Sequence, residues 1–212
     1  KQIKTRLGLT CGVSTILKVL EECPFIRRKK VKKIPPLTPK HKRARVQWAT
    51  ARLGWDIQWR QCIFSDEKKF NLDGPDGYSY YWHDIRKEEL HMMSRQQGGG
   101  SVMVWAAIGW TGRSPIAFVT VKLSAETYKT VLGEYLLPRK NEIAMPLVLF
   151  QQDNAPAHAA KKVKSWLESV NVPLMNWPSR SPDLNPMENC WGHMVRNIYA
   201  EGRQFDHVED LK

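Results

Sequence analysis

The order of the elements expected after residue 60 constrains the fold more than any other feature of the sequence. An alternating segment at 62–72 ends in the turn signal DGPDG (73–77), and a strand is expected to return at 78–82. Further strands are predicted at 101–108, 115–121 and 147–150, and helices at 124–137, 158–170 and 186–199. Antiparallel strands followed by alternating helix and strand predict an α/β fold, with a mixed sheet and helices on its faces.

Charge is distributed unevenly along the chain. Residues 1–60 hold 16 Lys or Arg against three Asp or Glu, a formal charge of +13, whereas residues 61–212 hold 17 against 18, a charge of −1. A basic arm on a neutral body suggests a protein that binds a polyanion. No apolar run approaches the roughly 18 residues that a membrane span needs. The four cysteines form no CxxC pair, which favours reduced thiols in an intracellular protein over a zinc knuckle.

The basic arm begins with a pattern that is typical of a helix-turn-helix. Apolar residues recur at helical spacing over residues 13–20, after a turn at 8–10, so residues 1–22 predict two short helices. The second helix of such a motif enters the major groove of DNA, and an ordinary helical hairpin is the alternative.

Two further basic segments follow this pair of helices. The run RRKKVKK (27–33) predicts phosphate contacts or nuclear import, or else a solvated linker. Residues 40–54 predict a basic helix with Val46, Ala49 and Leu53 on one face. The residues predicted to contact DNA are Ser14, Thr15, Lys18, Arg27, Arg28, Lys29, Lys30, Lys32, Lys33, Lys42, Arg43 and Arg45.

Asp66 is the first of three carboxylates that suggest chemistry. Alternation along the strand at 62–72 puts it on the same face as Phe64 and Phe70, and puts Glu67 on the opposite face. A carboxylate on the apolar side of a strand is costly unless it is paired or binds a metal ion. A salt bridge to Lys68 is the structural alternative.

The other two carboxylates follow a strand and begin a helix. Asp153 follows the apolar run at 147–150, where ligands collect in α/β sheets, although it could instead cap the next helix. Glu188 comes three residues after Asn185, a good N-cap, so a capping box is the alternative there. Two Asp and one Glu without His or Cys beside them form a hard oxygen site that suits Mg²⁺ or Mn²⁺. Carboxylates that hold two such ions are a common means of cutting phosphodiesters.

Blocks of sequence around these acids closely resemble the Tc/mariner superfamily of transposases. They are FSDEKKF (64–70), GGGSVMVW (98–105), QQDNAPAH (151–158) and WPSRSPDLNPMENCW (177–191), in the family's order. Between Asp153 and Glu188 lie 34 residues, which is the family's spacing, and Glu as the third acid resembles the Tc branch. The segment at 37–49 resembles the stretch that precedes the catalytic domain, and residues 1–22 resemble the family's second helix-turn-helix.

The resemblance implies a ribonuclease-H-like fold in which Asp66, Asp153 and Glu188 are the catalytic metal ligands, with two ions of Mg²⁺ or Mn²⁺. It gives Asn154 and His158 supporting roles at most, and it implies that the loop containing Asn185 presents Glu188. The implied activity is cut-and-paste transposition by a nuclear homodimer. Double-stranded DNA is cut at terminal inverted repeats, and the freed 3′-hydroxyl attacks a TA target.

Three regions are predicted on this basis: a partial helix-turn-helix module at 1–24, a basic linker and helix at 25–59, and the catalytic domain at 60–212. The family's first helix-turn-helix and its C-terminal end have no counterpart, so we expect a truncated chain. The alternative function is an inactive relic or a domesticated DNA-binding protein, which would keep its DNA affinity without cleavage. A nuclease acting on RNA–DNA hybrids is a third alternative, which the specific blocks disfavour.

Overall fold

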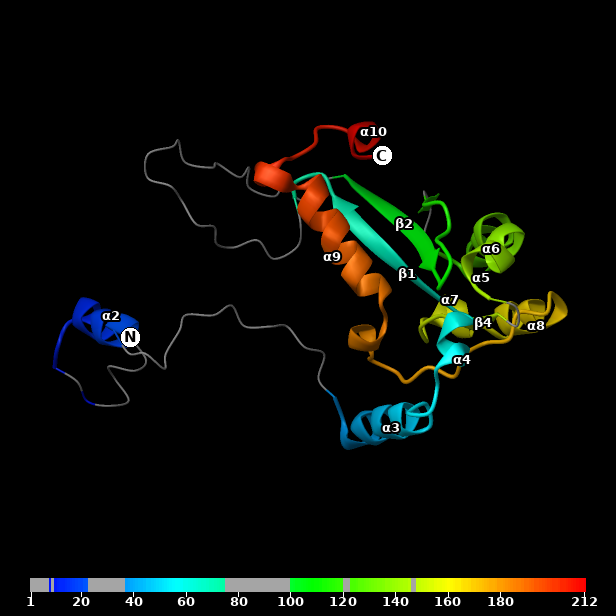
Figure 1. Ribbon diagram of the computed structural model, residues 1–212. Coiled ribbons are helices and arrows are strands. Elements are labelled where there is room, and N and C mark those ends of the chain that lie inside the picture. Colours follow the sequence, from blue (N-terminus) through cyan, green and yellow to red (C-terminus); the bar gives the residue numbers. More distant parts are fainter. Residues whose placement is uncertain (1–7, 9, 23–36, 75–99, 120–122, 146–147) are drawn as a thin grey trace. The chain divides into compact units, whose positions relative to one another are not determined.

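Figure 1 shows the computed structural model of the chain, which describes residues 8, 10–22, 37–74, 100–119, 123–145 and 148–212. The chain divides into two units, residues 1–36 and residues 37–212. The described part of the first unit contains the helix α2 (Val13–Glu22), and the helix-turn-helix stays a prediction. The run RRKKVKK and the strand predicted at 78–82 lie outside the described residues. None of the described helices is long and apolar enough to cross a membrane.

The second unit is built on a mixed sheet whose described strands have the order β3-β2-β1-β4. The central strand β1 (Cys62–Asn71) runs antiparallel to β2 (Ser101–Ile108) and parallel to β4 (Leu149–Gln151). The short strand β3 (Ala117–Val119) pairs antiparallel with β2. The predicted mixed sheet is confirmed, and β2 has the predicted bounds, while β3 begins at Ala117 instead of 115 and β4 ends at Gln151 instead of 150.

Helices from the middle of the chain cover one face of this sheet (Figure 1). α5 (Ala125–Val131) continues through a π-helical turn (Leu132–Leu136) and a 3-10 turn (Leu137–Arg139) into α6 (Lys140–Ile143), and α8 (Lys161–Ser169) packs beside α5. Side chains of α5 and α8 pack on the sheet residues Ile63 and Trp105, which are both fully buried.

The prediction of a single helix over 158–170 is wrong. Ala160 is extended, with φ −57° and ψ 134°, and it divides the segment into α7 (Pro156–Ala159) and α8. The hydrogen bonds of α7 end at this residue, so α7 is a separate helical turn with its own direction.

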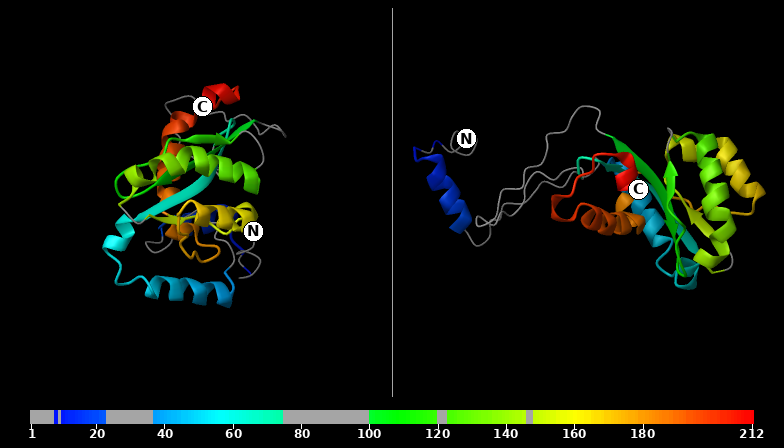
Figure 2. Two further views of the ribbon diagram at one scale, coloured as in Figure 1. Left: turned by 90° about the vertical axis from the view of Figure 1, so that its right-hand side faces the viewer. Right: turned by 90° about the horizontal axis from the view of Figure 1, so that it is seen from above.

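α9 (Met187–Ile198) covers the opposite face, so that the sheet lies between α9 and the α5–α8 pair in the view from above (Figure 2). Met187 and Trp191 are almost fully buried against Phe70, Val102 and Val104. The two faces of β1 therefore belong to two separate cores. The remaining short elements are α4 (Ile57–Arg60), a 3-10 turn (Pro182–Leu184), a second 3-10 turn (Ala200–Gly202) and α10 (Val208–Leu211).

α3 (Pro39–Thr50) packs against the rest of the second unit through a face other than the one with Val46, Ala49 and Leu53. Val46 is 65% exposed and Leu53 is 82% exposed. Trp48 instead contacts the ring of Trp177 edge-on, with 5.1 Å between the ring centroids. An indole buries more surface than a Val or a Leu, so Trp48 decides which face of the helix is packed.

Candidate active site

Asp66 lies in the middle of β1, on the face that α9 covers. The indole of Trp191 donates a hydrogen bond from Nε1 to Asp66 Oδ2 at 3.0 Å. Burial, together with the charges of Glu67 and Glu188, raises the pKa of Asp66 to about 7. The alternative ion pair between Asp66 and Lys68 is not formed in the described part of the chain. Asp66 is therefore a half-buried acid, oriented by an indole and crowded by other carboxylates.

Asp153 follows β4 and is held through one of its two carboxylate oxygens. Its Oδ1 accepts a hydrogen bond from the Ala155 amide at 2.9 Å and lies 2.6 Å from His158 Nδ1. Burial alone would raise the pKa of Asp153, but these hydrogen bonds outweigh burial and lower the pKa, so the group is ionised at neutral pH. Asp153 does not cap α7, whose first turn has no side-chain cap. The side chain is 55% exposed, which leaves Oδ2 open to a ligand.

His158 is the residue behind Asp153, and it is only 2% exposed. Its Nε2 lies 3.4 Å from Glu67 Oε1, and its ring stacks on Tyr128 with 4.0 Å between centroids. Burial would lower the pKa of His158, but the hydrogen bond with Asp153 and the charge of the nearby Glu67 carboxylate raise it to about 9. Gln152 accepts a hydrogen bond from the Tyr128 hydroxyl and donates one to the His158 carbonyl, both at 3.0 Å. A buried imidazolium therefore bridges two carboxylates.

Glu188 lies in the first turn of α9 and is exposed. The start of this helix is fixed by Asn185, whose Oδ1 accepts a hydrogen bond from the Met187 amide at 3.1 Å. Asn185 Nδ2 also donates to the carbonyl of Ser65, the residue before Asp66, at 3.0 Å. Glu188 does not form the capping box, because the Asn185 amide bonds to the Pro182 carbonyl instead. Asn185 thus ties the helix of Glu188 to the strand of Asp66.

The three acids line one cavity of about 440 Å³. Residues 177–182 form another wall, and Asn154 joins this wall to the loop of Asp153 by donating a hydrogen bond from Nδ2 to the Trp177 carbonyl at 3.0 Å. Among the described residues, no three His, Cys, Asp or Glu side chains converge closely enough to hold a single ion. The fold therefore brings the predicted acids to one cavity, but their side chains do not form a preassembled three-ligand metal site among the described residues.

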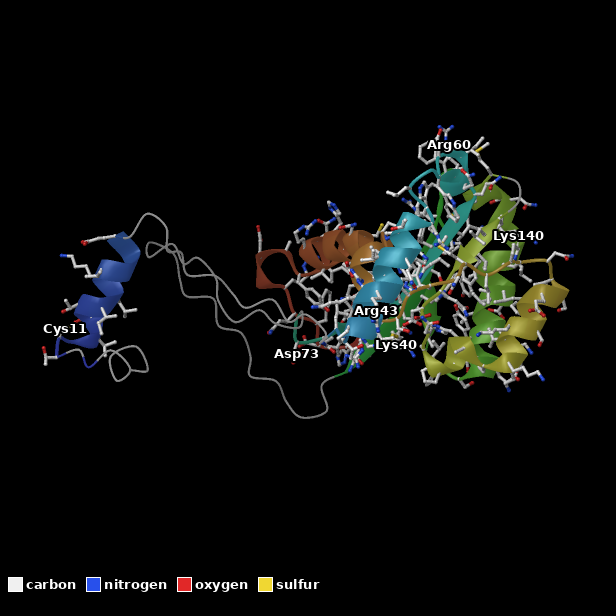
Figure 3. All side chains as sticks on the ribbon, turned by 90° about the horizontal axis from the view of Figure 1, so that it is seen from below. Cys11, Lys40, Arg43, Arg60, Asp73 and Lys140 are labelled. Atoms are coloured by element: carbon white, nitrogen blue, oxygen red, sulfur yellow. The ribbon has the colours of Figure 1, made fainter. Side chains whose placement is uncertain are left out.

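The residues predicted to contact DNA fall into two classes. Ser14, Thr15 and Lys18 are exposed on α2, and Lys42 is exposed on α3. Arg43, labelled in Figure 3, is exposed on α3 as well. Arg45 is different, because its guanidinium binds the Asp183 carboxylate through two hydrogen bonds, at 2.8 and 2.5 Å. The predicted contacts at 27–33 lie outside the described residues.

Sequence reasoning missed three parts of the site: Glu67, Tyr128 and Trp191. Trp191 comes three residues after Glu188, a spacing that puts both on neighbouring positions of one helix face, and this could have linked it to the acids. Glu67 and Tyr128 carried no such signal, because their partner His158 lies far away in the sequence.

Residues 61–212 match a protein family described as "DDE superfamily endonuclease". The whole chain is 40% identical to the Tc3 transposase of Caenorhabditis elegans, and it spans 64% of that protein's length. It is also 33% identical to the Tcb2 transposase of Caenorhabditis briggsae, a comparison that covers 99% of this chain and 80% of that one.

Solved structures of the Mos1 transposase share the fold. The Mos1 paired-end complex with the left transposon end matches with a TM-score of 0.73 and 20% identity, over 100% of this chain and 63% of that one. The Mos1 catalytic domain matches with a TM-score of 0.56 and 19% identity, over 85% of this chain and 81% of that one. These matches confirm the predicted ribonuclease-H-like fold. Together with the relatives that are 33–40% identical, they show that the chain belongs to the Tc/mariner superfamily of transposases, within the DDE superfamily endonucleases.

Proposed function

We propose that this chain is the cutting and joining part of a DNA transposase. It cleaves duplex DNA at the terminal inverted repeats of a transposon and transfers the freed ends to TA target sites. One observation carries this proposal: Asp66, Asp153 and Glu188 come from three separate elements and line one cavity. Membership of the family supports it, and the chain's 64% coverage of the Tc3 transposase makes the activity of the full protein part of the proposal.

The chemistry of the cavity fits divalent metal ions. Its acids offer only hard carboxylate oxygens, which suit Mg²⁺ and Mn²⁺. Burial, followed by the charges of Glu67 and Glu188, raises the pKa of Asp66 to about 7, and a bound cation would offset both effects. Mos1 has been solved in paired-end complexes with Mg and with Mn. We propose two ions, which would activate the attacking oxygen and stabilise the leaving oxygen of an in-line displacement.

The chain's own residues supply the orientation. Trp191 fixes one oxygen of Asp66, and Asp66 lines the cavity. His158 fixes one oxygen of Asp153 and leaves Oδ2 open. Asn185 sets the start of the helix that carries Glu188. Asp66 and Asp153 thus each have a partner that restricts rotation of the carboxylate, whereas Glu188 is placed through the backbone at the start of its helix.

DNA recognition falls to the basic arm in this proposal. The +13 charge of residues 1–60 would bind phosphates, with Ser14, Thr15 and Lys18 of α2 facing the bases. Mos1 binds a transposon end in its paired-end complex, and we extend that to this chain, acting as a homodimer on nuclear DNA.

Nicking of duplex DNA that carries the element's ends tests the proposal. Cleavage should require Mg²⁺ or Mn²⁺ and should be lost in Asp153→Ala. Cleavage by Asp153→Ala at the parent's rate would refute the assignment of the acids. Salt-sensitive DNA binding without cleavage under either metal would instead identify the chain as a DNA-binding relic.

A further inference from the structure

α3 is bound to the wall of the cavity along most of its packed face. At one end Trp48 Nε1 donates a hydrogen bond to the Asn176 carbonyl at 2.6 Å, and Arg52 Nη2 lies 3.4 Å from the same oxygen. One turn earlier, Arg45 forms the two hydrogen bonds with Asp183 and places Nη1 3.4 Å from the Arg180 carbonyl. α3 therefore holds both ends of the segment at 176–183, most of which lines the cavity.

The ion pair between Arg45 and Asp183 is built more firmly than an ordinary surface pair. Asp183 is 60% exposed, but the Arg45 side chain is only 19% exposed, because it lies against the protein along its length. Two parallel hydrogen bonds fix the angle of the carboxylate as well as its distance. The hydrogen bond with Asp183 raises the pKa of Arg45, and the one with Arg45 lowers the pKa of Asp183. A bidentate pair of this kind sets geometry even where it adds little stability.

Asp183 lies in the 3-10 turn that leads to the third acid. The Leu184 amide bonds to the Ser181 carbonyl, and the Asn185 amide bonds to the Pro182 carbonyl, so the turn is a rigid unit around Asp183. Asn185 ends this turn and receives the Met187 amide on its side chain, one residue before Glu188. Arg45 on α3 is therefore connected to the helix start that carries Glu188 through Asp183, the hydrogen-bonded turn that contains Asp183, and Asn185.

We propose that Arg45 is a positioning residue for Glu188: by clamping Asp183 it fixes the turn at 182–185, and the turn fixes the start of α9. The inference rests on the proposed metal role of Glu188. It makes α3 a structural part of the active site, so that a displacement of α3 would loosen the third metal ligand.

The test measures Mn²⁺ affinity of the full chain without DNA, by electron paramagnetic resonance of free Mn²⁺. Partners of a metal ligand cost about 10–100-fold in affinity when they are removed. Arg45 acts one step further out, so Arg45→Ala and Asp183→Ala should each weaken affinity by about three- to tenfold. The double variant should lose no more than either single variant. Exchanging the pair, Arg45→Asp with Asp183→Arg, should restore most of the affinity. Lys40→Ala removes a cation from the exposed side of the same helix (Figure 3) and should bind Mn²⁺ like the parent.

Amide hydrogen exchange gives a second readout that needs no metal. In Arg45→Ala the amides of Leu184, Asn185 and Glu188 should exchange about three- to tenfold faster, while the paired amides of β1 and β2 stay unchanged. Unchanged exchange at these amides in the Arg45 and Asp183 variants would overturn the inference. If the parent itself binds no Mn²⁺, the proposed metal role of the acids fails, and the exchange data still decide whether Arg45 fixes the turn. If the single variants do not fold, failure of the exchanged pair to regain Mn²⁺ affinity would equally overturn it.

Discussion

Asp66 and Glu67 are neighbours on β1 with the same charge, yet they face opposite sides of the sheet. Asp66 meets an indole and a cavity that contains two other acids. Glu67 meets a buried imidazolium at 3.4 Å, and its side chain is 17% exposed. The helices that pack on each face decide this difference. The first turn of α9, which is exposed at Glu188, lies near Asp66, whereas α5 and α7 bring the stacked rings of Tyr128 and His158 to Glu67.

The groups that face a carboxylate decide whether it is available to bind a metal ion. Glu67 is compensated by a charge that belongs to the protein, whereas among the described residues the donors to Asp66 are neutral, the Trp191 indole and the backbone of Glu67. A buried carboxylate without a countercharge is unfavourable, so the Asp66 side is the one prepared for a cation from outside. Both sides serve one site, because His158 transmits the position of Glu67 to Asp153.

The largest expected effect is at Asp66. Asp66→Asn keeps the shape and can still accept the Trp191 hydrogen bond, but it removes a proposed metal ligand. Cleavage should fall by about 10³-fold or more, because the metal contributes several kcal/mol to the transition state. The metal-free protein should unfold at a slightly higher temperature at pH 8, because a crowded buried charge is gone. Nicking assays and calorimetry in EDTA measure the two effects, and a fall in both would mean that Asp66 acts through stability.

His158 should give the next largest effect. His158→Gln removes the cation that compensates Glu67, and leaving one charge of a buried pair should lower the free energy of unfolding by about 3 kcal/mol. Mn²⁺ affinity should fall by about 10–100-fold, because Asp153 loses its positioning partner. Urea unfolding and Mn²⁺ titration measure these effects. The matched control adds Glu67→Gln to His158→Gln, which should recover part of the lost stability, and a purely additive double variant would contradict the coupling of the two residues.

The acids that line the cavity were expected from the sequence, and so was a supporting role at most for His158, whereas the bridge that His158 forms between Asp153 and Glu67 was not. Alternation along β1 separates Asp66 from Glu67 correctly, and Asn185 was expected in the loop that presents Glu188. Helical periodicity, by contrast, continues through Ala160, where the chain is extended. The interruption of the helix at Ala160 makes α7 a separate turn, and from this turn His158 contacts both Asp153 and Glu67, which is distant in the sequence.

The prediction of which face of α3 is packed was wrong for a related reason. Its Val46 and Leu53 suggested an apolar face, but the packed face is formed by Trp48 and by two arginines whose partners lie about 130 residues away. Amphipathic side chains such as Arg and Trp are buried by what they meet, and a single segment of sequence does not contain that information.

Glu67 itself should give a smaller effect than either residue above. Glu67→Gln keeps an oxygen that can accept from His158 Nε2, so cleavage should fall by less than about tenfold. Removal of the charge should also lower the pKa of Asp66, since Glu67 is one of the causes that raise it to about 7. Carboxyl chemical shifts followed against pH, in metal-free protein, measure the change. An unchanged pKa of Asp66 would show that the two faces of β1 are electrostatically independent.

The last and smallest effect concerns Cys62, the first residue of β1, whose side chain lies on the same face as Asp66. Its reactivity with a thiol reagent measures how accessible that face is to solvent. Burial raises the pKa of the Cys62 thiol to about 11, and the side chain is 0% exposed, with Sγ 3.2 Å from the Gln58 carbonyl. At pH 8 a thiol reagent should modify the partly exposed Cys190 and leave Cys62 unmodified until the protein unfolds. Labelling followed by peptide mass spectrometry, with and without urea, measures this. If Cys62 reacts in the native protein as fast as Cys190, the buried end of the Asp66 face of β1 opens in solution, and burial would not explain why the cavity reaches Asp66 but not Cys62.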